Sequence, residues 1–271
     1  MDKTDRLLED ILLFLRNERA LYGDWGDPAG SAGSAAGPAA DTHRSEESPS
    51  AGMPVNDSSD KPDPDPPGEP AGSSSGAASN ILTGRCKTLS ELEELCSSAD
   101  VLRTDLKDTN LVFGTGNPDA DLMVVGEAPG YHEDRQGEPF VGRAGKLLDK
   151  ILAAIQFSRD NVYIANILKH RPPENRNPTP EERASSLPYL TRQIELVDPK
   201  LILCLGRVSG TTLLDREDSL KNLRGQFHPF MGRLLMVTYH PAALLRNPVW
   251  KRPAWEDVRM LREKYDELSR P

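Results

Sequence analysis

The sequence predicts an α/β protein with three layers, α/β/α, around a central, mainly parallel four-stranded sheet. Three observations support this prediction: short apolar runs recur along the last two-thirds of the chain, helical patterns alternate with them, and turn-forming residues mark their ends. Strands that alternate with helices pair in parallel and have helices on both faces. The expected strands are 122–125, 161–167, 201–205 and 234–238.

The helices expected between these strands have recognisable beginnings. Thr88 or Ser90 can cap a first short helix, and Pro180 suits the first turn of a longer one. The expected helices cover about 89–99, 145–155, 180–197, 207–214 and 254–269.

The N-terminal third differs from the rest in composition. Residues 1–22 contain an amphipathic helix, which is expected to dock either on the domain behind it or on a protein partner. Residues 23–82 are rich in Pro, Gly, Ser and Ala, are acidic, and have too few apolar residues to form a core, so we expect a disordered linker. Residues 83–271 form the expected globular domain.

The net charge of −9 is unevenly distributed. Residues 1–82 hold 6 of the 33 Lys and Arg and 15 of the 42 Asp and Glu, which leaves 27 of each kind for the remainder. The domain is therefore neutral overall and can approach a polyanion through local basic groups. Three scattered cysteines do not form a disulfide framework. With no long apolar span and no secretory signal at the acidic N-terminus, a cytoplasmic protein without a membrane partner is expected.

The stretch 122–145 carries the strongest functional signal. The buried strand 122–125 is bounded by the turn-forming Gly126, and Glu127 follows directly. A connection dense in carboxylates and glycines leads on to Phe140 and is far longer than the usual 2–6 residues. Such loops at the carboxyl end of a parallel sheet form ligand crevices.

Unusual polar residues also follow two other strands, Asn166 after the second and His240 after the fourth. In a parallel sheet these ends converge with Glu127 and Phe140 on one crevice. An amide beside an aromatic ring can read a flipped nucleobase, through its hydrogen-bonding edge and its π-face. The sequence has no phosphate-binding GxxxxGK[ST] motif, no GxGxxG after a strand and no spaced set of metal ligands.

Three sequence motifs resemble those of one protein family. The runs GEAPGYHEDRQGEPFVGRAGKLLD, NILKHRPPENRNPTPEE and TYHPAALLRNPVWKRPAWEDV look like those of the family 4 uracil-DNA glycosylases, in the same order and with the same spacing. The resemblance extends from about residue 112 to 261. It implies an enzyme that flips uracil out of DNA, hydrolyses its N-glycosidic bond and starts base excision repair.

The resemblance implies which residues bind uracil. Phe140 would stack on the base, and Gly126 would lie in the uracil-binding set. Asn166 would donate to O4 and accept from N3–H, a pattern that cytosine does not match. Glu133 would crowd the 5-position and exclude the methyl group of thymine.

The same resemblance implies the catalytic residues and the DNA contacts. His240 would donate to O2 as negative charge grows on the base, and Glu127 would act on the attacking water, either as a base or as an electrostatic stabiliser. Leu244 and Leu245 would wedge into the duplex. The basic residues expected to meet phosphates are Arg246, Lys251, Arg252, Lys169, Arg171 and Arg176.

The chain departs from the family at the cysteines that usually hold a [4Fe–4S] cluster. The corresponding positions are Ala99, Leu102, His170 and Ser186. Cys86 and Cys96 lie upstream and could make a shifted pair, but with His170 they provide at most three ligands, and four are needed. No metal or other cofactor is therefore expected.

Two alternatives to a uracil-specific enzyme stay open. One is a relative without catalytic activity that binds uracil-containing or single-stranded DNA, and the other is a glycosylase with broader base choice. The combination of Glu127, Asn166 and His240 favours an enzyme, and Glu133 with Asn166 favours uracil. We expect a monomer whose partner is uracil-containing DNA.

Overall fold

The computed structural model describes residues 79–270. The expected helix at 1–22 and nearly all of the expected linker lie outside this range. Residues 79–83 are helical, so regular structure begins a few residues before 83. Within the described range, no helix is both long and apolar enough to cross a membrane.

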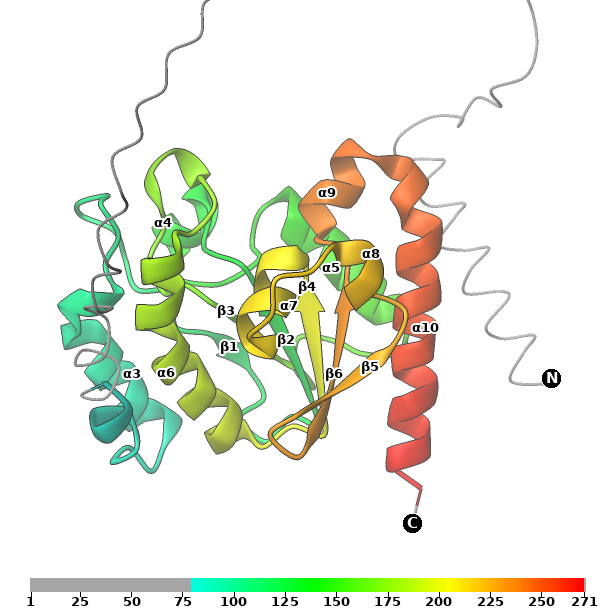
Figure 1. Ribbon diagram of the computed structural model, residues 1–271, viewed down its shortest axis with the longest axis horizontal. Helices are drawn as coiled ribbons and strands as arrows, with labels where there is room; N and C mark the ends of the chain where they lie inside the picture. The colour runs from blue at the N-terminus through cyan, green and yellow to red at the C-terminus, as the bar shows by residue number, and fades with distance from the viewer. Residues whose placement is uncertain (1–78, 271) are drawn as a thin grey trace, which may run out of the picture. The chain divides into compact units, whose positions relative to one another are not determined.

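One sheet forms the centre of the described domain, with strands in the order β1-β3-β2-β4-β6-β5 (Figure 1). Its four inner strands are the expected ones and pair in parallel. They are β2 (Leu122–Gly126), β3 (Tyr163–Asn166), β4 (Leu201–Leu205) and β6 (Arg233–Thr238). The α/β class and the parallel core are thus confirmed.

The sheet has six strands, so the expectation of four was wrong. β1 (Thr115–Gly116) and β5 (Phe227–Phe230) add antiparallel edges to β3 and β6. β1 is only two residues long and lies in a stretch whose sequence predicts a turn. β5 contains Pro229, which is tolerated only at a sheet edge, and its hairpin turn uses Met231 at a positive φ of 48°, where Gly or Asn is usual.

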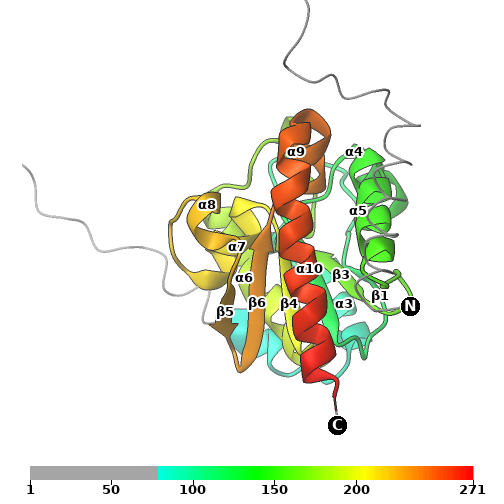
Figure 2. The same cartoon turned by 90° about the vertical axis from the view of Figure 1, so that its right-hand side faces the viewer.

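Helices cover both faces of the sheet (Figure 2). The strand residues alternate between two apolar clusters: in β2, Leu122 and Val124 pack with α5 and α10, whereas Met123 and Val125 pack on the side of α6 and α7. The three expected layers are therefore present. The described helices are α3 (Leu89–Ser98), α4 (Tyr131–Gln136), α5 (Arg143–Ala154), α6 (Pro180–Val197), α7 (Arg207–Leu214), α8 (Leu220–Leu223), α9 (Pro241–Arg246) and α10 (Lys251–Leu268).

Local sequence explains where the longer helices begin. Thr88 caps α3 by accepting a hydrogen bond from the Glu91 backbone, and Thr179 with Glu182 forms a capping box at the start of α6. The short helices α4, α8 and α9 were not expected, because four to six residues show no helical period.

A buried carboxylate joins α10 to the end of β6. Asp257 accepts hydrogen bonds from Thr238 Oγ1 (2.6 Å) and from the Arg224 guanidinium, whose Nη2 lies 2.8 Å from Asp257 Oδ1. The Asp257 side chain is only 1% exposed. Because Thr238 is the last residue of β6, this contact fixes the strand end from which the next loop departs.

We expect Asp257→Ala to lower the free energy of unfolding by about 3 kcal/mol, because it leaves the partly buried Arg224 guanidinium without its counter-charge and Thr238 Oγ1 without its acceptor. The neighbouring Glu256→Ala removes an exposed carboxylate and should change it by less than about 0.5 kcal/mol. Urea denaturation followed by circular dichroism measures both. Equal effects of the two substitutions would contradict the structural role of Asp257.

Candidate active site

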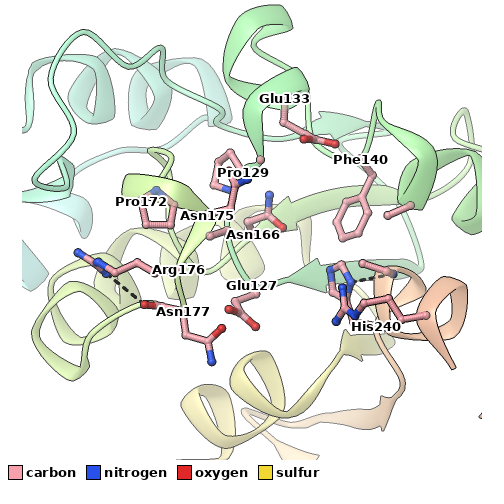
Figure 3. A pocket seen from close by; sticks show the side chains of 15 residues that line it. Glu127, Pro129, Glu133, Phe140, Asn166, Pro172, Asn175, Arg176, Asn177 and His240 are labelled. Atoms are coloured by element: carbon pink, nitrogen blue, oxygen red, sulfur yellow. Dashed lines mark hydrogen bonds between the residues drawn. The ribbon is translucent and has the colours of Figure 1, made fainter. Parts of the chain in front are cut away.

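The functional pocket lies at the carboxyl ends of the parallel strands. It encloses about 410 Å³ and is open to solvent. Loops after β2, β3 and β6 form its walls, and the side chains of Glu127, Asn166 and His240 point into one space with Phe140 (Figure 3). These four residues, which the sequence placed together, do meet in the structure.

The last residue of β2, Gly126, has no side chain and so leaves room for the pocket side chains to approach one another. Gly126 pairs in register with Asn166 across the two parallel strands. A Cβ at Gly126 would lie 2.3 Å from Asn166 Oδ1 and 2.5 Å from Phe140 Cζ. The amide and the phenyl ring therefore approach the same point, and a side chain at 126 would push them apart.

The backbone of Phe140 adopts a strained conformation that its neighbours hold in place. Its φ is +57°, which is uncommon for a bulky residue. The Arg159 guanidinium donates to the carbonyl oxygens of Phe140 and Pro139. A Cβ at Gly145 would overlap the Phe140 carbonyl oxygen, so only glycine fits at this position in the first turn of α5.

Asn166 carries the clearest sign of an absent ligand. Its side chain is 2% exposed, and its Oδ1 has no hydrogen-bond partner among the described residues. Buried polar atoms are normally paired, and an unpaired one costs about 1–3 kcal/mol. A ligand with a matching donor would satisfy this oxygen.

His240 is held as a neutral hydrogen-bond donor. Its Nδ1 accepts from the Ala242 backbone N–H (3.1 Å), so the proton of the neutral ring is on Nε2. Burial lowers the pKa of His240 to about 4, and the Arg246 charge adds to the shift while Glu133 opposes it. The ring stacks on Phe140, with 5.6 Å between centroids.

Glu127 is the carboxylate at the end of β2. Burial raises its pKa, while the charges of Arg207 and Arg183 work in the opposite direction. In Figure 3 the carboxylate points into the open part of the pocket. It can thus hold a water molecule by accepting a hydrogen bond from it.

Glu133 lies on the pocket wall in α4. Its Oε1 accepts from the backbone N–H groups of Val141 (3.0 Å) and Gly142 (3.1 Å). These bonds fix the carboxylate and tie α4 to the segment that follows Phe140. The sequence indicated Glu133 as a ligand-facing residue but not this second role in holding the loop.

The expected DNA contacts are only partly available. Leu244 is 2% exposed and packs with Leu147 and Ala254, so it does not project as a wedge in this structure. Leu245, its neighbour on α9, is half-buried and remains a candidate. Lys169 is fully buried and cannot meet a phosphate.

The arginines near the pocket differ in their partners. Arg246 is exposed at the pocket rim. Arg176 also lines the pocket but forms two 2.8 Å contacts with Glu182. Arg171 donates to Asn175 Oδ1 (2.8 Å) and lies over the ring of Tyr131, which is 52% exposed.

The region where the family holds its cluster does not fit one here. Cys86 and Cys96 are buried beside Leu102 and Tyr189, and burial raises the pKa of the Cys96 thiol to about 12, which disfavours the thiolate that metals bind. His170 Nδ1 lies 3.0 Å from Thr109 Oγ1. Among residues 79–270, no three His, Cys, Asp or Glu side chains converge as metal ligands would.

Comparison with known proteins agrees with this geometry. A family model for the uracil DNA glycosylase superfamily matches residues 113–259. The chain is 42% identical over 176 residues to the type-4 uracil-DNA glycosylase of Archaeoglobus fulgidus, an alignment that covers 62% of this chain and 87% of the relative. It is 44% identical to that of Saccharolobus solfataricus, over 57% of this chain and 76% of the relative.

The chain therefore belongs to the uracil-DNA glycosylase superfamily. The type-4 enzyme of Thermotoga maritima is also 44% identical, over 52% of this chain and 75% of the relative. Within the superfamily, the chain is a member of the type-4 family.

We expect the His240 ring to stay neutral at pH 7 and to take up a proton only as the pH falls toward about 4. Arg246→Ala removes a repelling positive charge and should raise this pKa, whereas Glu133→Gln removes an attracting negative charge and should lower it. NMR titration of the imidazole signals measures all three values. A wild-type midpoint near the ordinary value of about 6.5 would contradict the assignment.

Proposed function

We infer that this protein is a uracil-DNA glycosylase, which hydrolyses the N-glycosidic bond of uracil in DNA and starts base excision repair. The observation that carries this inference is the unpaired, buried Oδ1 of Asn166 beside the Phe140 ring, at the end of two adjoining strands. The type-4 relatives, whose names state this activity, support it.

Base selection follows from these two side chains. A flipped uracil stacks on Phe140, accepts at O4 from the Asn166 amide and donates its N3–H to the Asn166 oxygen. Cytosine has a hydrogen-bond donor at position 4 and an acceptor at N3, so neither hydrogen bond with the Asn166 amide can form. Buried polar groups that are left unpaired in this way discriminate strongly against cytosine. Glu133, whose carboxylate is fixed by two backbone N–H groups, is proposed to crowd position 5 of the base and so to exclude the methyl group of thymine.

The reaction breaks the bond between uracil N1 and the sugar C1′. The bonding electron pair leaves with the base, and the negative charge spreads from N1 to O2 and O4. The Nε2–H of His240 donates to O2, and one such donor lowers a barrier by about 3–4 kcal/mol. The sugar becomes oxocarbenium-like, and water held by Glu127 attacks C1′. The proton released by the water passes to Glu127 or solvent, and uracil takes up a proton after release.

Binding of the DNA strand is assigned to the rim of the pocket. Arg246 is exposed there and can meet a phosphate, and Arg171 lies beside the exposed ring of Tyr131. Leu245 is the residue of α9 proposed to fill the gap left by the flipped base.

The test is release of uracil from an oligonucleotide, measured as abasic sites under single-turnover conditions. Asn166→Asp should slow uracil release about a hundredfold and remove the preference over cytosine, because the donor to O4 is lost. His240→Ala should slow it by a similar factor. Asn161→Asp, an exposed change just before β3, serves as the matched control and should leave the rate unchanged.

Absence of uracil release by the wild-type protein would contradict the proposed function. Binding of the uracil oligonucleotide without release would favour the catalytically inactive relative instead. Normal rates in both Asn166→Asp and His240→Ala would contradict the assignment of the site.

We also propose that the enzyme works without an iron–sulfur cluster. The apolar packing of Leu102 and Tyr189 around the two buried cysteines supports this. The purified protein should be colourless and lack stoichiometric iron by elemental analysis, and the Cys86→Ala and Cys96→Ala variants should keep wild-type cleavage rates. A brown protein with iron at cluster stoichiometry, or iron loss in these variants, would contradict the proposal.

The remaining assignments are proposals about organisation. We propose that residues 83–271 act as the catalytic domain and that residues 1–22 are available to a protein partner. We also propose a monomer, because the residues that line the pocket in the described part of the chain come from one copy. A cytoplasmic location suits three cysteines that are all unpaired and buried.

A further inference from the structure

Lys169 lies directly behind the uracil-reading residue. It is 0% exposed and follows Asn166 by three positions. Its Nζ donates to the backbone carbonyl of Asn166 (3.0 Å), to that of Phe113 (3.2 Å) and to Gln193 Oε1. The three N–H bonds of the ammonium group therefore all have partners, and one of these is the residue whose side chain forms the pocket floor.

These hydrogen-bond partners are neutral oxygens, so the ammonium charge is not cancelled by a bonded carboxylate. Burying such a charge is unfavourable, and burial lowers the pKa of Lys169 to about 8. The titratable groups that face it are the Cys96 thiol on α3 and, through Gln193, the Tyr163 hydroxyl on β3. Burial raises the pKa of both, so both are neutral at pH 7 while Lys169 remains mostly charged.

A positive charge behind the pocket would oppose the negative charges inside it. Glu127 and Glu133 both line it, and the departing uracil carries a further negative charge. The side chains of His240 and Asn166 are neutral, so they can stabilise this negative charge only through their dipoles. Of the two arginines in the wall, Arg246 is exposed to water, which weakens its effect on the base relative to that of a buried charge, and Arg176 is paired with Glu182.

We propose that Lys169 is a positioning residue for the glycosylase reaction, which holds the end of β3 through the Asn166 carbonyl and whose buried charge stabilises the departing uracil anion. The ammonium keeps its proton throughout, and no bond to it forms or breaks. This proposal rests on the proposed function. A merely structural role, in which Lys169 only ties β3 to α6, would not depend on the charge of the base.

A change of leaving group distinguishes stabilisation of the anion by the Lys169 charge from a merely structural role of Lys169. Fluorine at position 5 withdraws electrons and stabilises the anion of the base, so 5-fluorouracil needs less help from the protein. At about pH 6.5, where Lys169 is charged, Lys169→Met should slow release of uracil by about tenfold or more. It should slow release of 5-fluorouracil several-fold less.

Gln193→Met is the matched control, because it removes a partner in the same buried network and keeps the ammonium. It should slow release of both bases by equal factors. Equal losses on the two bases in Lys169→Met would overturn the proposal, whereas a wild-type protein that releases neither base would instead overturn the proposed function.

A second measurement applies even if Lys169→Met does not fold. In the wild-type protein, uracil release should decline as the pH rises through about 8, because Lys169 loses its proton there. A folded Lys169→Met variant should lack this decline. A wild-type rate that stays level up to about pH 9 would overturn the proposal.

Discussion

The site depends on one constraint, the absence of a side chain at the end of β2. Gly126 is in register with Asn166, and only a bare α-carbon lets the Asn166 amide and the Phe140 ring approach the same point. A similar constraint operates at the end of β4, where a Cβ at Gly206 would come within 3.3 Å of the His240 Cβ. Gly126 thus leaves the space that a base can fill, and Gly206 leaves room for the backbone end of the His240 side chain.

The rest of the structure supports side chains that would not hold this arrangement alone. Phe140 sits at a positive φ, and backbone strain of this kind persists only where neighbours fix it. Arg159 holds its carbonyl from one side, and Glu133 binds the next two N–H groups. The loop is therefore preorganised before a base enters, so the base does not have to order it.

The sequence predicted what strong local patterns specify. The four inner strands were visible as apolar runs, and the residues after them converge because parallel strands end together. The sequence did not predict β5, because Pro229 and the positive φ at Met231 are unusual for a strand and its hairpin turn. It also did not predict the burial of Leu244, because a helix as short as α9 shows no period that would tell which of its faces packs inward. Lys169 looked like a phosphate contact because sequence position does not reveal which side of a strand end a side chain enters.

The proposed role of Lys169 also gives a catalytic meaning to an apolar cluster that does not line the pocket. Cys96 on α3, Tyr189 on α6 and Phe113 in the segment before β1 belong to one apolar cluster. This cluster keeps water away from the Lys169 ammonium and so preserves the low dielectric in which its charge reaches the base. In our proposal, the packing of this apolar cluster is therefore coupled, through one buried cation, to the Asn166 end of β3.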